Sequence, residues 1–227
     1  MPALITWWTM DVRGLAPHAL GNDVVERLGA DLLARWSEPT RRYHTTTHLV
    51  EMFGALEEME EAGEIDDRQC SVARLAAWFH DAIYDPAASP GSNEAGSAAL
   101  ARTALRQLSL GDNDIDAIDR LILLTARHDT DAAEPLDAAF HDADLWILCA
   151  EQARFDAYCD QVRQEYAHVP DTRYRRARAA ILGPLLHRDR IYRTSHALHG
   201  WETRARINLG RELTRLRAEP EAGPSGD

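Results

Sequence analysis

A vicinal histidine–aspartate pair, His80-Asp81, constrains this chain more than any other feature. It directly follows the apolar run 75–79 (LAAWF), which is typical of a buried helix. Imidazole and carboxylate side chains resist desolvation unless they are paired or bound to a metal ion. They are also the nitrogen and oxygen ligands that divalent and first-row transition metals accept. The pair therefore predicts a metal site at the end of a core helix.

Apolar residues recur at helical spacing almost throughout the chain, and no segment alternates as a half-buried strand does. Helices are expected near 24–36, 49–59, 72–79, 93–108, 115–128, 136–150, 152–166, 172–188 and 196–217, with a loop rich in proline and glycine over 84–92. The sequence thus predicts an all-α protein. We expect a single helical bundle over residues 1–218 with extra C-terminal helices, followed by a disordered tail over 219–227.

Composition narrows the classes of protein that this chain can represent. A length of 227 residues and a hydrophobic content of 45% suit one domain with its own core. A net charge of −12 argues against binding to nucleic acids, because their phosphate backbones are bound by basic surfaces. The three cysteines have no CxxC spacing, which indicates buried thiols in a reducing compartment rather than a cysteine metal site. No stretch approaches the roughly 18 apolar residues of a membrane span, so a cytoplasmic protein without a membrane partner is expected.

The basic residues are unusual because all 25 are arginine and lysine is absent. A Walker-type P-loop, a protein-kinase site and a Schiff-base mechanism each need a lysine, so all three are excluded. Residues 171–217 hold twelve arginines against only four acidic residues. Ion pairs with the acidic remainder of the chain, together with solvated helix faces, are the favoured explanation. The alternative is that one or two of these arginines reach a substrate phosphate.

Further candidate ligands lie upstream and downstream of the His80-Asp81 pair. His44 and His48 are four residues apart, so on a helix they would share one face and point into one cavity. His80 and Asp81 are adjacent, and both can reach one ion only from a helix end or from a local distortion of the helix. Asp144 comes from a later helix and would close the ligand set. Side chains from facing helices are the usual source of metal sites in helical bundles.

This arrangement resembles the HD superfamily of metal-dependent phosphohydrolases, whose signature is His, then His-Asp, then a distant Asp. The resemblance is carried within residues 42–150 by the segments YHTTTH, AAWFHDAIYDP, SNEAGSA, TARH and FHDADLWIL. The later stretches VRQEYAHVPD, RRARAAIL and ARINLGREL are similar to a bacterial branch of that superfamily described only as predicted phosphohydrolases. The segment from Tyr43 to His48 is also similar to the start of cyclic-nucleotide phosphodiesterase catalytic domains.

The resemblance implies a role for each matching residue. His48, His80, Asp81 and Asp144 become ligands of a divalent metal, and His44 becomes the proton donor. Asp142 could compete with Asp144, but residues two apart on a helix point to different faces, and Asp144 is preferred. The ion could be Mn, Co, Ni, Fe, Mg or Zn, and the site could hold one ion or two.

Three further residues keep two interpretations each. His128 could bind a second metal ion, as an extra histidine does in two-metal members of the superfamily, or could simply end a helix. Asp85 could orient a catalytic water or cap the turn before Pro86. Glu94 could contact a second metal or the substrate, or could be an ordinary residue of a first helical turn.

The expected activity is metal-dependent hydrolysis of a phosphate ester. The expected substrate is a nucleotide or another small phosphorylated metabolite. Two alternatives stay open at the level of the sequence. One is a di-iron oxygenase of the HD type, and the other is a nucleotide-binding regulatory module without turnover. The sequence sets no oligomeric state, and a homodimer is compatible with it.

Overall fold

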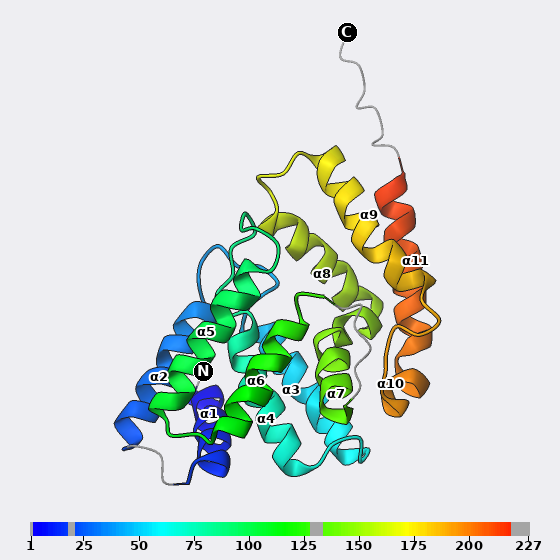
Figure 1. The fold of residues 1–227 in the computed structure, drawn as a ribbon. Helices are drawn as coiled ribbons and strands as arrows, with labels where there is room; N and C mark the ends of the chain where they lie inside the picture. The colour runs from blue at the N-terminus through cyan, green and yellow to red at the C-terminus, as the bar shows by residue number, and fades with distance from the viewer. Residues whose placement is uncertain (1, 18–20, 128–133, 219–227) are drawn as a thin grey trace.

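The computed structural model describes residues 2–17, 21–127 and 134–218. These residues form eleven α-helices and one short 3₁₀-helix, and none of them lies in a β-strand (Figure 1). The predicted all-α class is therefore confirmed. The expected tail over 219–227 lies outside the described residues.

The helices follow one another in the chain with short connections. The first six are α1 (Pro2–Leu15), α2 (Asn22–Trp36), α3 (Thr46–Glu61), α4 (Asp67–His80), α5 (Ser92–Gln107) and α6 (Asp112–Leu124). They are followed by α7 (Pro135–Asp144), the 3₁₀-helix η1 (Trp146–Cys149), α8 (Gln152–Glu165), α9 (Asp171–His187), α10 (Ser195–Gly200) and α11 (Glu202–Arg217).

Helix α4 is the centre of the bundle and contacts α1, α3, α5, α6 and α7. Its residues from Leu75 to His80 are all buried, as expected for a helix that is apolar on every side. A capping box begins the helix: the Asp66 side chain accepts from the Gln69 amide, and the Gln69 side chain accepts from the Asp66 amide. The helix therefore starts at the surface and delivers His80 and Asp81 into the interior.

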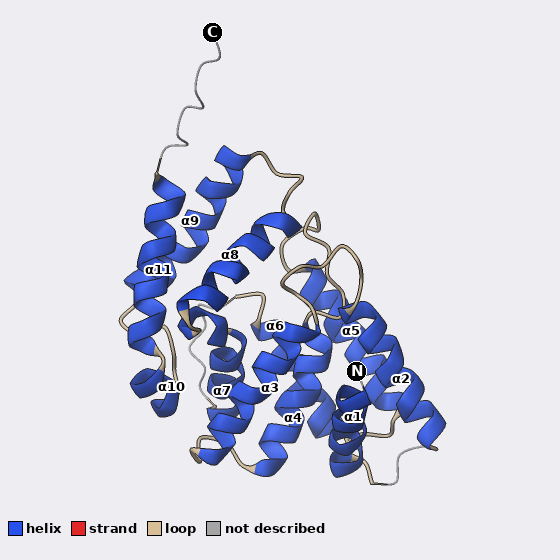
Figure 2. Cartoon of the chain, turned by 180° about the vertical axis from the view of Figure 1, so that it is seen from behind, coloured by secondary structure: helices blue, strands red, loops and turns tan. Residues whose placement is uncertain are grey.

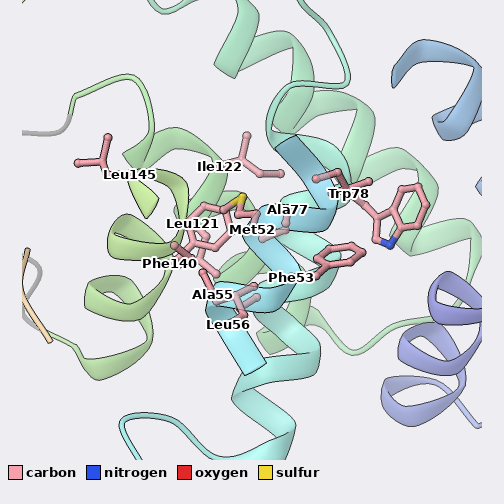
Figure 3. Close-up of a cluster of buried hydrophobic side chains, with 14 of the residues drawn as sticks. Met52, Phe53, Ala55, Leu56, Ala77, Trp78, Leu121, Ile122, Phe140 and Leu145 are labelled. Atoms are coloured by element: carbon pink, nitrogen blue, oxygen red, sulfur yellow. The ribbon is translucent and has the colours of Figure 1, made fainter. Parts of the chain in front are cut away.

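Large side chains fill the space around α4. Figure 3 shows Met52, Phe53 and Leu56 of α3 packed among Trp78, Leu121 and Phe140. The indole of Trp36 donates to the Trp78 carbonyl at 2.9 Å and so ties α2 to α4. A Cβ atom at Gly29 would lie 2.5 Å from the Trp8 ring, which shows how closely α1 approaches α2.

Helices α8, η1, α9 and α11 form the remaining part of the bundle, on the side of α3 and α7. Helices α9 and α11 lie side by side in both views (Figures 1 and 2). Helix α11 also packs on η1, where the Asn208 amide donates to the carbonyls of Leu148 and Ala150 at 2.9 Å each. Helix α11 thus connects α9 to η1, which follows α7, and residues of α9 and the end of α7 line one cavity.

Several elements differ from the sequence-based expectation. The helix expected over 136–150 ends at Asp144, and residues 146–149 form the 3₁₀-helix η1 instead. Helix α1 is not among the helices expected from the sequence, because packing against α2 and α4 stabilises it. The single helix expected over 196–217 is broken at Trp201 into α10 and α11. The break is held by Glu202, whose carboxylate accepts from the amides of Ile191 and Tyr192. Among the described residues, no helix is long and apolar enough to cross a bilayer.

Candidate metal centre

Three helices bring the candidate ligands together at one end of the bundle core. His48 lies in the first turn of α3, and His80 is the last residue of α4. Asp81 follows directly as the residue that ends α4, and Asp144 is the last residue of α7. The histidines are buried, whereas the two carboxylates are only partly covered. The group is therefore anchored in the core and open on its carboxylate side.

The ligand atoms lie at the separations that a bound ion requires. His48 Nε2 is 3.3 Å from His80 Nε2, and Asp81 Oδ2 is 3.1 Å from His80 Nε2 and 4.0 Å from His48 Nε2. Asp144 Oδ1 is 3.3 Å from His48 Nε2 and 3.6 Å from His80 Nε2. Atoms that bind one ion at about 2.1 Å lie roughly 3 to 4 Å apart. The buried group His48, His80 and Asp81 could thus hold a metal ion, with Asp144 beside it.

Neighbouring groups fix the orientation of both imidazoles. His80 Nδ1 donates to the Ala77 carbonyl at 2.8 Å, which leaves Nε2 of the neutral ring as the free lone pair. His48 Nδ1 is 3.1 Å from the Tyr43 hydroxyl, and its Nε2 faces the same point as that of His80. The Trp36 ring packs on His80 with centroids 5.5 Å apart. Partners of this kind are what hold metal-binding histidines in proteins.

We expect metal binding to release a proton from His80. Burial lowers the pKa of this imidazole, but the adjacent Asp81 carboxylate outweighs burial and raises the pKa to about 9. A cationic ring cannot bind a metal, so metal affinity should rise by about tenfold per pH unit from neutral pH up to about pH 9. Titration calorimetry with Mn²⁺ in two buffers of different ionisation enthalpy would count the released proton. An affinity that is constant over this pH range would contradict the expectation.

His44 lies at the edge of the ligand group but not on helix α3. The helix begins at Thr46, and Thr45 is its N-cap, accepting from the Thr47 amide. The expectation that His44 and His48 share a helical face is therefore wrong, because the capping turn intervenes. His44 nevertheless reaches the centre: its Nε2 lies 3.9 Å from Asp81 Oδ2. Its ring stacks on Tyr84 with centroids 4.2 Å apart.

Glu165, the last residue of α8, is a site residue that the sequence did not reveal. Its Oε2 accepts from His44 Nδ1 at 2.7 Å and from the Tyr84 hydroxyl at 2.9 Å. Its Oε1 accepts from the backbone amides of residues 42–44 at 2.7, 2.8 and 3.1 Å. Burial raises the pKa of this carboxyl, but its bonds to His44 outweigh burial and lower the pKa to about 2. Glu165 therefore stays ionised and points His44 Nε2 toward Asp81.

The ionised Glu165 should stabilise the fold in a pH-dependent way. Because its pKa falls from 4.5 to about 2 on folding, its contribution is complete above about pH 5 and is lost as the pH falls toward 2. The shift corresponds to roughly 3 kcal/mol in the free energy of unfolding. Urea unfolding of the wild type and of Glu165→Gln should therefore differ at pH 6 by about this amount and converge near pH 2. A difference that persists unchanged into acid would contradict this account.

Arg41 is a second residue that sequence patterns did not indicate. This buried guanidinium donates to the carbonyls of Asp81 at 2.7 Å, Ala82 at 3.3 Å and His44 at 3.3 Å. Glu38 supplies the opposite charge at 3.0 Å. Arg41 therefore ties the turn that carries His44 to the end of α4, which sets the distance between the proposed proton donor and the ligand group.

The competing carboxylate Asp142 points away from the ligand group. It is fully buried, and its oxygens accept from the amides of Arg193 and Thr194 and from the Thr194 hydroxyl, at 2.8 to 3.0 Å. His141 Nδ1 lies 2.8 Å from the same carboxylate. Asp142 therefore holds the segment before α10, whereas Asp144 faces the histidines.

The other sequence candidates occupy different places. Asp85 is exposed in the 84–92 loop, where its Oδ1 accepts from the Ala87 amide at 2.8 Å, so its carboxylate holds the turn. Glu94 lies in the first turn of α5 and lines the cavity described next. His128 lies outside the described residues.

The ligand group opens into a cavity of about 340 Å³. His44, His48, His80, Asp81 and Asp144 all line it. Aromatic and aliphatic side chains from α8, η1 and α9, among them Tyr158, Ile147 and Leu182, form one part of the remaining wall, and Asn93 and Glu94 of α5 line another. The candidate metal centre, the proposed proton donor and a space for a small molecule therefore coincide.

Comparison with known proteins finds no matching family model, no similar curated protein and no similar solved structure.

Proposed function

We propose that this protein is a metal-dependent phosphohydrolase of the HD type. One observation carries the proposal: a histidine held by a buried carboxylate lies beside a His/His/Asp group that could bind a metal, in one cavity. His44 Nε2 and the ligand His80 Nε2 lie 3.9 and 3.1 Å from the same oxygen, Asp81 Oδ2. A proton donor next to a Lewis-acid site is the requirement for cleaving an ester bond with a poor leaving group.

The residues of the chain divide the chemistry between them. His48, His80, Asp81 and Asp144 would hold a divalent ion, which supplies polarisation of the phosphoryl group and acidifies water. Water would form the new P–O bond as the bond to the leaving oxygen breaks. His44 Nε2 would give its proton to that oxygen, and a proton lost by the attacking water would restore the protonated ring. Glu165 keeps the His44 ring in place and stabilises its cationic form before the transfer. The products are an alcohol and a phosphate.

The proposed substrate is a small phosphate ester, a nucleotide or another phosphorylated metabolite. A cavity of about 340 Å³ is at the lower end of the range for small-molecule sites, roughly 300 to 1,000 Å³. This size favours a compact phosphate ester over a polymeric or heavily extended ligand.

Phosphate release from purified protein tests the proposal. The chain would be stripped of metal with a chelator, reloaded separately with Mn²⁺, Co²⁺, Ni²⁺ or Mg²⁺, and assayed with an aryl phosphate and a nucleotide panel. We expect activity with at least one metal and none in the stripped protein. His44→Gln should keep the metal and lose most of the activity, because it removes the proton donor and no ligand.

Failure to release phosphate from any substrate with any metal would contradict the hydrolase proposal. Oxygen consumption that depends on bound iron would instead support the oxygenase alternative. Tight nucleotide binding without turnover would support the regulatory module.

A further inference from the structure

Helix α9 brings one arginine, Arg178, into the wall of the cavity. The side chain is partly buried, and its guanidinium lies over the Tyr158 ring with Cζ 5.3 Å from the ring centroid. One of its Nη2 hydrogens is donated to the Tyr158 hydroxyl. Leu182 and Leu185, on the next turns of α9, line the same cavity. Arg178 is thus a cation beside the part of the wall that Val162, Leu182 and Leu185 make apolar.

Among the partly buried arginines of helices α9 and α11, Arg178 is the one that has no carboxylate partner in the described part of the chain. Arg206 donates a hydrogen bond to the Glu202 carboxylate, and Arg215 donates one to the Glu212 carboxylate. By contrast, the Tyr158 hydroxyl is the one acceptor that the described residues offer to Arg178. The Tyr158 hydroxyl proton has no acceptor among them either. A partly desolvated guanidinium without a counter-charge is unfavourable, so its place in a cavity wall indicates an anionic ligand.

The position of Arg178 separates this anion from the phosphate at the metal centre. Tyr158 packs edge-on against Tyr43 with centroids 4.6 Å apart, and the Tyr43 hydroxyl contacts His48 Nδ1. These contacts link the guanidinium to the nearest proposed ligand, His48, through two aromatic rings. None of the described ion pairs links Arg178 to Asp81 or Asp144. The guanidinium is not a member of the ligand group, although it shares its cavity.

We propose that Arg178 and the Tyr158 hydroxyl bind a second anionic group of the substrate, a carboxylate or a further phosphate. The inference rests on the proposed hydrolase function, because it places the scissile phosphate at the metal centre. The substrate is then a phosphate ester with anions at both ends and a short apolar body between them. The body contacts the apolar wall that Val162, Leu182 and Leu185 contribute.

Binding of non-hydrolysable phosphonates to the Mn²⁺-loaded protein tests this inference without turnover. The probes are butylphosphonate, 4-phosphonobutyrate and butane-1,4-bisphosphonate, together with the analogues one carbon shorter and longer. The first probe has no second anion, the second has a carboxylate and the third has a phosphonate. Comparing the last two therefore shows whether the site prefers a carboxylate or a phosphate. We expect at least one two-anion probe to bind the wild type about 10- to 100-fold more tightly than the simple phosphonate, the ratio for one charge-assisted contact.

Variants assign that preference to Arg178. Arg178→Met should abolish the preference and leave butylphosphonate binding unchanged, whereas Arg178→Lys should keep part of it. Arg176→Met, an exposed arginine on the same helix, is the matched control and should bind as the wild type does. Thermal unfolding of each variant checks that the fold is retained.

Other outcomes would overturn the inference in distinguishable ways. A wild type that binds all probes equally would overturn the second-anion site alone, as would an equal loss of every probe in Arg178→Met. The latter would place the guanidinium on the metal-centred phosphate. A wild type that binds no phosphonate at all would overturn the proposed function and this inference with it.

Discussion

Replacing Asp81 with alanine should abolish metal binding and phosphate hydrolysis together while leaving the protein folded. The Asp81 carboxylate lies 3.1 Å from His80 Nε2 and 3.9 Å from His44 Nε2, so it is the one group that faces both the ligand pair and the proposed proton donor. The neighbouring imidazoles outweigh burial and lower its pKa well below the usual range, so the carboxylate is fully ionised and ready to bind a cation. We expect kcat to fall by at least about 10³-fold, as for loss of a metal-held catalytic site.

The fold should survive this substitution because Arg41 binds the backbone carbonyl of Asp81, which alanine retains. Metal content by mass spectrometry, kcat and the far-ultraviolet circular dichroism spectrum would be measured on the same preparation. Asp160→Ala is the matched control, because the Asp160 side chain is 66% exposed on α8 and belongs neither to the ligand group nor to the proposed proton donor's partners. Full activity in Asp81→Ala would remove the basis of the proposed centre. A lost helical spectrum would instead show that Asp81 is needed to fold.

Much of the fold follows from local patterns in the sequence. The helix that ends at His80 combines a capping sequence at Asp66, an apolar run and two polar residues at its end, and each of these signals is local. Helix α1 and the break at Trp201 are different, because contacts with distant helices decide them. The Glu202 carboxylate that fixes the break accepts from amides about ten residues earlier in the chain. No periodicity within the segment encodes that bond.

The candidate site divides in the same way. The ligand types and their approximate spacing are visible in the sequence, because metal-binding residues need imidazole and carboxylate side chains near helix ends. The groups that orient them are not visible. Glu165 follows His44 by 121 residues, and Arg41 precedes Asp81 by 40. Each is an ordinary charged residue in its own segment, and only the packing of α8 and of the turn before α3 shows its role.

Replacing Glu165 with glutamine should lower kcat by about 10²- to 10⁴-fold without removing the metal. Glutamine has the same size, and its carbonyl oxygen can still accept from the backbone amides of residues 42–44. It carries no charge, however, so the protonated form of His44 loses the carboxylate that lies 2.7 Å from its Nδ1. The ring then has no counter-charge while it holds the proton that it must donate, and it is less firmly oriented toward the leaving oxygen. Metal content should match that of the wild type, because Glu165 contacts none of the four proposed ligands.

The leaving group of the substrate separates this role from a general structural effect. An aryl phosphate with an acidic phenol needs little protonation as its ester bond breaks, so Glu165→Gln should slow its hydrolysis only slightly. An alkyl phosphate needs a full proton, so its hydrolysis should show the whole decrease in kcat. Glu212→Gln is the matched control: Glu212 is a buried glutamate on α11 paired with Arg215, away from the cavity. Its substitution should lower stability but leave the ratio of the two rates unchanged. Equal losses on both esters in Glu165→Gln would show that the carboxylate acts on folding or metal binding rather than through the proton of His44.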